Sequence, residues 1–312
     1  MAKRKKSKKR GGFKKRLILL FLALLAAACV WGAVNAHIVH VDYVDAYIEN
    51  LSPFLEGTRV LFASDFKITS ESDASRAVNT MKRLAGGSVR PDIILLGGDY
   101  TAYTLADTMK TQTQAGQTKI LNRLKGARRA FFAGLSEIYA PGGIFAVAGD
   151  ADSAVPGLTE DCRVGNVYLL DNGTACTLVN NTPIYIVGCR DYKTGDGKSY
   201  RFSGPGATDT VLAFAHNPDS CRQISSVNDK SGSPLADLIF CGHTLGGQIS
   251  IRGKTLLAHA GIYKGEFQSG LYAESQTRVN TLVSSGIGTE WLPIRLGSRA
   301  QVYFVTLHRK TK

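Results

Sequence analysis

Residues 92–99 read DIILLGGD, an apolar run of strand length that ends in two glycines and a carboxylate. A run that is apolar on both faces is typical of a strand buried inside a sheet. Similar runs occur on either side of it along the chain, at 59–64, 143–149, 166–171, 183–189, 210–216, 235–242 and 301–307. Residues 73–84 have a helical pattern, and residues 104–139 predict one long helix or two broken ones. This alternation predicts one α/β domain whose sheets are covered by helices.

Side chains that can bind a metal follow five of these runs, at the point where each strand is expected to end. They are Asp65, Asp99, Asp150, His216 and His243. Ligands in open α/β sheets sit at the carboxyl ends of strands. Any one of these residues alone would more often cap a turn or lie in the core, but five in order favour a shared site. Carboxylates and imidazoles with glycines around them suit a hard or borderline divalent cation.

The formal net charge of +13 is concentrated at the N-terminus. Ten of the 38 Lys and Arg residues lie within the first sixteen positions, where no acidic residue occurs, and the rest of the chain carries only +3. The next twenty residues, 17–36, have no charge and would form a helix about 30 Å long, which is one bilayer crossing. Because a basic block beside an apolar span already has a topological role, we do not expect it to bind nucleic acid.

This pattern predicts four regions. They are a basic cytoplasmic tail (1–16), a transmembrane anchor (17–36), a linker (37–57) and one folded domain (58–312). The positive-inside bias places the N-terminus in the cytoplasm and the domain on the far side of the cell membrane. The small residues at 34–36 leave open the alternative of a signal peptide that is removed by cleavage. The uninterrupted apolar length favours a retained anchor, with the lipid bilayer as a partner.

Two further segments are the most specific parts of the sequence. They are GHTLGGQI at 242–249 and SSGIGTEWLPIRLGSRAQVYFVTL at 284–307. Together with the five strand ends, they give residues 58–307 a resemblance to the calcineurin-like metallophosphoesterases, in particular the membrane-anchored branch of bacterial phosphohydrolases. The resemblance implies an α-β-β-α sandwich, in which two packed mixed β-sheets are flanked by helices, preceded here by the transmembrane helix. It also implies metal-dependent hydrolysis of a phosphoester, carried by a small molecule or by a lipid.

The chain departs from the family's pattern at the first of the family's two metals. The resemblance implies an Asp-x-His pair and a final His in a Gly-His-x-His motif, where this chain has Lys67 and Leu245. The ligands implied for the second metal are present by type, as Asp99, Asp150, His216 and His243. Here Asp150 stands in place of the family's Asn. We therefore expect one divalent ion, of the Mn, Fe, Zn or Mg class, rather than two.

Charge balance assigns a role to Lys67. Three carboxylates, one divalent ion and Lys67 sum to zero, so its ammonium group would replace the first metal and neutralise Asp65 and Asp99. The alternative is that Lys67 points to solvent and the pocket is a relic. The family's catalytic His is replaced by Ala151, which makes the neighbouring Asp152 a candidate proton donor. The candidate catalytic residues are thus Lys67, Asp65 and Asp152, and the candidate metal ligands are Asp65, Asp99, Asp150, His216 and His243.

Two functions of different classes fit these residues. The first is an enzyme, a membrane-anchored phosphoric ester hydrolase in which one ion and Lys67 polarise the phosphoryl oxygens. The second is a catalytically impaired pseudoenzyme that binds a metal, a phosphorylated ligand or a partner. The lost ligands and the lost catalytic His favour the second function, whereas the retained ligands of the second metal favour some use of a metal.

Overall fold

A computed structural model describes residues 3–191, 204–206, 208–229, 232–251, 254–257, 267–273 and 279–310. Its first sheet has the strand order β1-β14-β2-β3-β4-β5. The strands are β1 (Val39–Ile48), β2 (Arg59–Ala63), β3 (Ile93–Leu96), β4 (Ile144–Ala146), β5 (Tyr168–Leu169) and β14 (Ala300–Arg309). Strand β14 runs parallel to β1 and antiparallel to β2, and the pairs from β2 to β5 are parallel. The sheet is therefore mixed.

The second sheet has the order β12-β13-β9-β8-β7-β6. Its strands are β6 (Gly173–Val179), β7 (Thr182–Cys189), β8 (Val211–Ala215), β9 (Leu238–Cys241), β12 (Gly270–Tyr272) and β13 (Thr281–Val283). The neighbouring strands β7, β8, β9 and β13 are parallel to one another, and β6 and β12 pair antiparallel at the two edges. A separate hairpin pairs β10 (Ile249–Ile251) with β11 (Lys254–Leu257).

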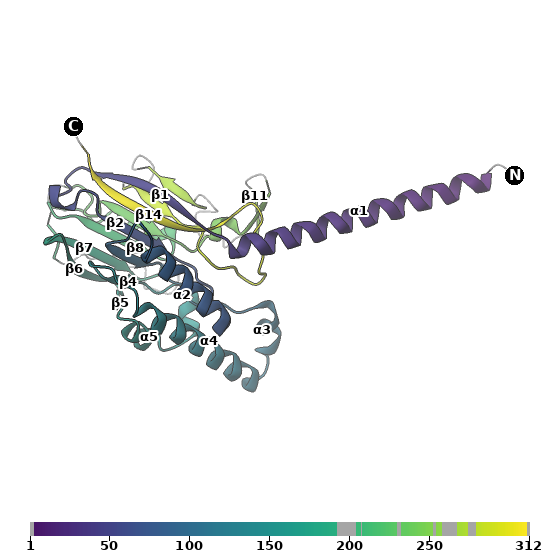
Figure 1. The fold of residues 1–312 in the computed structure, drawn as a ribbon, viewed down its shortest axis with the longest axis horizontal. Coiled ribbons are helices and arrows are strands. Elements are labelled where there is room, and N and C mark those ends of the chain that lie inside the picture. Colours follow the sequence, from purple (N-terminus) through teal and green to yellow (C-terminus); the bar gives the residue numbers. More distant parts are fainter. Residues whose placement is uncertain are drawn as a thin grey trace.

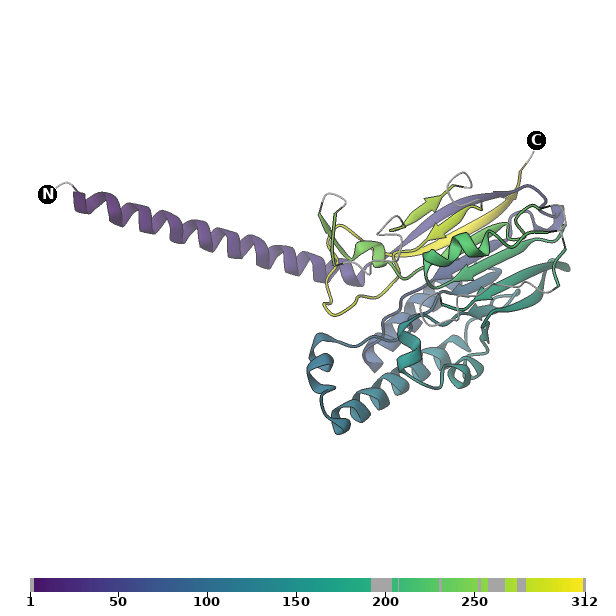
Figure 2. The same cartoon turned by 180° about the vertical axis from the view of Figure 1, so that it is seen from behind.

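Helices cover the outer faces of both sheets (Figure 1 and Figure 2). The α-helices are α1 (Lys3–His37), α2 (Glu71–Ala85), α3 (Leu105–Lys110), α4 (Gln114–Leu135), α5 (Leu158–Val164) and α6 (Cys221–Ile224). Short 3-10 helices are η1 (Pro53–Leu55), η2 (Ala151–Ala154), η3 (Pro218–Ser220) and η4 (Leu245–Gly247). The layers are therefore helix, sheet, sheet and helix, which confirms the predicted sandwich.

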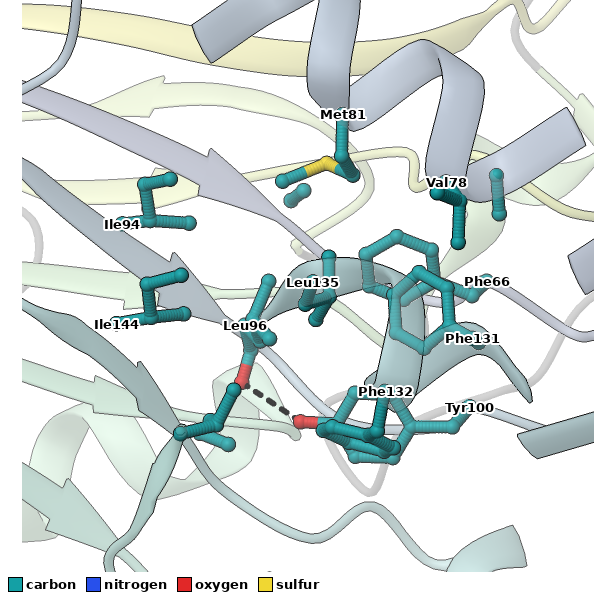
Figure 3. Close-up of a cluster of buried hydrophobic side chains, with 14 of the residues drawn as sticks. Phe66, Val78, Met81, Ile94, Leu96, Tyr100, Phe131, Phe132, Leu135 and Ile144 are labelled. Carbon is teal, nitrogen blue, oxygen red and sulfur yellow. Dashed lines mark hydrogen bonds between the residues drawn. The ribbon is translucent and has the colours of Figure 1, made fainter. Parts of the chain in front are cut away.

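Apolar side chains on alternate faces of the strands build the layers. On the face between the sheets, Phe62 of β2 meets Phe240 of β9, with ring centroids 5.3 Å apart. On the outer face of the first sheet, Figure 3 shows Met81 of α2 and Phe131 of α4 packed over the strands. The hydroxyl of Tyr100 is buried in this layer and donates to the carbonyl of Val147 at 3.0 Å. Because successive strand side chains point to opposite faces, one apolar run supplies both cores.

Residues 37–57, for which the sequence predicts a linker, contain a strand of the first sheet. Strand β1 pairs with β14 along its whole length, from Val39 opposite Ala300 to Ile48 opposite Arg309. Its Asp and Tyr side chains lie among the apolar ones, so it lacks the continuous apolar run that marks the other buried strands. Residues 104–139 form two helices, α3 and α4, which begin at the capping residues Thr104 and Thr113.

Helix α1 projects away from the sandwich (Figure 1). Its stretch Phe13–His37 is long and apolar enough, by length and composition, to cross a membrane. The side chains of this stretch are largely exposed in the chain by itself, as those of a helix surrounded by lipid would be.

Candidate metal centre

The five predicted strand-end residues lie in loops at the carboxyl ends of β2, β3, β4, β8 and β9. Backbone hydrogen bonds join two of the loops, from the Asp65 N–H to the carbonyl of Gly98 and from the Lys67 N–H to the carbonyl of Asp99. Asp65, Asp99 and His243 have positive φ angles of 52°, 57° and 69°. Residues with side chains rarely adopt this conformation, and it is held in place by surrounding contacts, often at functional sites.

Four of these residues form one cluster, and their possible ligand atoms all lie within 4.8 Å of one another. They are Asp99, Asp150, His216 and His243. The Nε2 atom of His216 lies 3.2 Å from Asp99 Oδ2 and 3.3 Å from Asp150 Oδ1. The Nδ1 atom of His243 lies 3.4 Å from Asp150 Oδ1 and 3.2 Å from His216 Nε2. Two imidazole nitrogens and two carboxylates therefore converge, and this cluster could bind a metal ion.

A backbone carbonyl sets the orientation of His216. Its Nδ1 lies 2.7 Å from the carbonyl oxygen of Gly97, so the N–H is on Nδ1 in the neutral ring. The lone pair of Nε2 then points into the cluster, as it does in metal-binding histidines whose second nitrogen is hydrogen-bonded.

The cluster is negatively charged without a cation. Burial would lower the pKa of His216, but the charge of Asp99 and the hydrogen bonds of both carboxylates raise that pKa well above its usual value. Burial also opposes ionisation of Asp99 and Asp150, and the neighbouring histidines, with Lys67 beside Asp99, still lower both carboxyl pKa values. A divalent cation would neutralise the two carboxylates, and a proton on His216 would offset half of their charge.

Asp65 lies beside the cluster without belonging to it. Its Oδ2 accepts hydrogen bonds from the Ser64 hydroxyl at 2.8 Å and from the His243 N–H at 2.9 Å. Its other oxygen, Oδ1, is buried and accepts no hydrogen bond from the described part of the chain. A buried carboxylate oxygen without a partner is costly, which suits a position where a ligand is to bind.

Lys67 is buried beside the cluster. Its Nζ donates to Asp99 Oδ2 at 2.5 Å and to Glu290 Oε2 at 2.8 Å. Burial would lower the pKa of Lys67, but the charges of Asp99, Glu290 and Asp65 outweigh it and raise the pKa above its usual value. The ammonium group thus lies among carboxylates and does not point to solvent. Its second bonded partner is Glu290, where the sequence predicts Asp65.

Asp152 holds the loops together. Its Oδ2 accepts hydrogen bonds from the N–H groups of Asp99 and Gly149, both at 2.8 Å, and its Oδ1 accepts one from the Tyr100 N–H at 3.0 Å. Burial and the charge of Asp99 raise the pKa of Asp152 to about 6, although these backbone bonds lower it. Both carboxylate oxygens are therefore engaged with the backbone of the loops that carry Asp99 and Asp150.

The two most specific sequence segments meet at the site. Gln248 donates through Nε2 to the carbonyl of Glu290 at 3.1 Å and accepts from the Glu290 N–H at 2.8 Å. The buried guanidinium of Arg295 donates to carbonyls of both segments, among them Leu245 at 3.1 Å and Ser285 at 2.7 Å. Leu245, in the position of the family's final His, is buried behind the loop.

Glu290, Gln248 and Arg295 are absent from the site predicted from the sequence. The resemblance singles out both segments that contain them, but neither residue type nor spacing indicates that Glu290 contacts Lys67. The two residues are 223 positions apart, and only the fold brings them together.

The sandwich and its Asp and His residues at strand ends agree with the resemblance of the sequence to metal-dependent phosphoesterases. No family model matches the chain. A Caenorhabditis elegans protein named metallophosphoesterase F40B5.2 is 24% identical over 235 residues, which cover 70% of this chain and 42% of that protein. Phosphodiesterase YaeI of Escherichia coli (strain K12) is 25% identical over 270 residues, 83% of this chain and 84% of that protein. The chain thus spans less than half of the worm relative. The phosphoesterase names of both relatives support the resemblance seen in the sequence.

Proposed function

We propose that the chain is a membrane-anchored, metal-dependent phosphohydrolase with one metal ion in an altered site. The observation that carries the proposal is the convergence of Asp99, Asp150, His216 and His243 within 4.8 Å. The basic residues before the apolar part of α1 favour a cytoplasmic N-terminus, with the catalytic body on the far side of the membrane.

The four ligand groups fit a divalent cation of the Mn, Fe or Zn class. A set of two imidazoles and two carboxylates suits these ions better than a set of oxygen ligands alone. An ion held there supplies the positive charge that withdraws electron density from a phosphoryl oxygen. We propose that the four clustered residues bind it and that Asp65 lies outside its first set of ligands.

The neighbouring residues can act directly on the substrate. The ammonium of Lys67 has three N–H donors and uses two on Asp99 and Glu290, which leaves one for a phosphoryl oxygen. The unpaired Oδ1 of Asp65 can accept a proton from the attacking water. We assign Asp152 a positioning role, because its oxygens already accept backbone hydrogen bonds.

The leaving group has no evident proton donor among these residues. Ala151 replaces the family's catalytic His, and both oxygens of Asp152 are occupied. A leaving group that departs without protonation must be a weak base. We therefore expect phosphodiesters with acidic leaving groups to be the better substrates, and turnover to fall steeply as the pKa of the leaving alcohol rises.

A pseudoenzyme that binds metal or a partner is the second candidate, and Glu290 is the observation that favours it. Its carboxylate makes the site one unit more negative than the balance predicted from the sequence. An anionic phosphoester binds less readily to such a site.

One experiment separates the two candidates. The full chain in detergent is assayed for bound metal by mass spectrometry, and for hydrolysis of a nitrophenyl phosphodiester with added manganese. We expect about one ion per chain, and His243→Ala should lose the ion and on the order of 100-fold in turnover. His308→Ala, which alters a histidine near the other end of β14 that pairs with Glu56 on the surface, is the control and should change neither quantity. Bound metal without turnover would leave the pseudoenzyme as the function.

The double variant Lys67→His/Leu245→His tests why the site holds one ion. It restores the two residue types that the family uses at its first metal, in a pocket that already contains Asp65 and Asp99. We expect the metal content to rise from about one to about two ions per chain. An unchanged content in a folded variant would show that Lys67 does not take the place of an ion.

A further inference from the structure

Helix α1 is joined directly to the sandwich and packs against it. Only residue 38 separates its last residue from the first residue of β1. The carbonyl of Gly32 accepts a hydrogen bond from the Arg295 N–H at 2.9 Å, and Gly32 and Ala36 are buried against the body. A Cβ atom at Gly32 would lie 3.2 Å from side-chain atoms of Ile294 and Leu296, so the helix and the body are in close contact. The direction in which α1 leaves therefore fixes how the body is oriented on a membrane.

Large apolar side chains are exposed around the point where α1 leaves. Trp291 is 51% exposed and Leu292 38% exposed, and they lie just before the residues that contact α1. On α3, Leu105 and Met109 are 54% and 73% exposed, and their spacing of four puts them on one face of the helix. A β-bridge between Thr104 and Trp291 joins the two segments. Figures 1 and 2 both show α3 on the side of the body from which α1 projects.

A cavity of about 400 Å³ opens within this same face. Its lining includes Ala36 and His37 at the end of α1, and Trp291 and Leu292 of the exposed loop. It also includes Lys67, which contacts Asp99 of the metal cluster. The cavity therefore lies between the end of the predicted membrane span and a residue that contacts the metal cluster.

We propose that this face, formed by Trp291, Leu292, Leu105 and Met109, rests on the surface of the lipid bilayer that α1 spans. Tryptophan and leucine side chains partition into the interface between lipid headgroups and acyl chains. Because α1 already holds the body at the bilayer, contact of this face with lipid costs little further translational and rotational entropy. A small apolar area is therefore enough to keep the face on the bilayer. The cavity then opens toward the lipid headgroups. The proposal rests on α1 spanning a bilayer and does not depend on catalysis.

The two tryptophans of the chain allow a direct test in phosphatidylcholine vesicles that carry the full chain. Trp31→Phe leaves Trp291 as the single reporter, and Trp291→Phe leaves Trp31, which lies within the span. The matched control is Trp31→Phe/Trp291→Phe/Tyr47→Trp, which places the reporter at the far end of β1, at a residue that is 58% exposed. Lipids brominated near the headgroup quench a fluorophore in the interface, and acrylamide quenches one in water.

We expect brominated lipids to quench Trp291 several-fold more strongly than the reporter at position 47, with the reverse order for acrylamide. The proposal would be overturned if acrylamide quenched Trp291 and the reporter at position 47 equally and brominated lipids quenched neither of them. This conclusion requires that brominated lipids still quench Trp31. Loss of lipid quenching at Trp31 would show that α1 does not span the bilayer, and the proposal would fail with it. Shielding of Trp291 that disappears as the protein is diluted into more lipid would identify a second copy of the chain as the occupant instead.

Discussion

Glu290 places a second carboxylate on the ammonium of Lys67. Its carboxylate lies 2.8 Å from the ammonium of Lys67, which makes it a competitor for any phosphate that approaches that cation. The other partner of Lys67, Asp99, belongs to the metal cluster and cannot be removed without disturbing the ion. Glu290 is therefore the residue through which the anion affinity of the site can be changed alone.

We predict that Glu290→Gln binds phosphate more tightly. The amide keeps the shape and can still accept from Lys67, while one negative charge is lost. Inorganic phosphate, measured as an inhibitor of phosphodiester hydrolysis or by calorimetry, should bind roughly five- to tenfold more tightly. Glu137→Gln is the matched control, because Glu137 also pairs with a lysine but on the surface. Equal phosphate affinity in the parent and in Glu290→Gln would show that Glu290 does not compete for Lys67.

Carboxylates at strand starts set the register of the elements that carry the site. Asp237 precedes β9, and its Oδ2 accepts a hydrogen bond at 2.7 Å from the N–H of Val211, the first residue of β8. Asp92 makes the equivalent bond to the N–H of Arg59, the first residue of β2. Because His216 and His243 follow the ends of β8 and β9, the register of these strands decides how the two imidazoles meet.

The Asp237 carboxyl gives a pH-dependent contribution to stability. Burial raises its pKa to about 6, although the Val211 N–H lowers it. The folded chain therefore binds this proton more tightly than the unfolded chain does, and the group destabilises the fold as pH rises from about 4 to about 6. Asp237→Asn keeps an acceptor for Val211, so it should be more stable than the parent by about 1 to 2 kcal/mol at pH 7.5 and not at pH 4. Urea unfolding in detergent at both pH values measures this difference, and a difference that is the same at both values would contradict it.

Arg295 forms hydrogen bonds to three segments that are far apart in the chain. Its buried guanidinium donates to carbonyls in the loop after β9 and in the segment after β13, and its own N–H donates to the carbonyl of Gly32 in α1. Burial lowers its pKa to about 10, opposed by the charge of Asp65. One residue thus connects α1, the second sheet and the loops of the site.

We predict that Arg295→Lys lowers the free energy of unfolding by about 2 to 4 kcal/mol, because a lysine cannot reach several carbonyls at once in a planar arrangement. The matched control is Arg299→Lys, at an exposed arginine that pairs with Asp42, and it should cost less than about 1 kcal/mol. Thermal unfolding of the full chain in detergent compares the two variants. Equal costs would show that the buried contacts of Arg295 do not stabilise the fold.

The sequence by itself determined the α/β class, the main strands, the apolar span in α1 and the residue types of the candidate metal ligands. These features depend on local pattern, since a buried strand needs a continuous apolar run and a ligand at its end follows directly along the chain. The sequence also predicts that the ammonium of Lys67 takes the place of the first metal, and this stays a prediction.

Only the tertiary structure decided which groups surround that lysine and how α1 meets the two-sheet body. Glu290 pairs with Lys67, Asp152 bonds to backbone instead of facing a substrate, and β1 joins the sheet through its pairing with β14. Each of these contacts joins residues far apart in the chain. Residue type and periodicity indicate whether a segment is buried and whether its side chains need a hydrogen-bond or charge partner. Which residue becomes that partner depends on how the two sheets and α1 pack together.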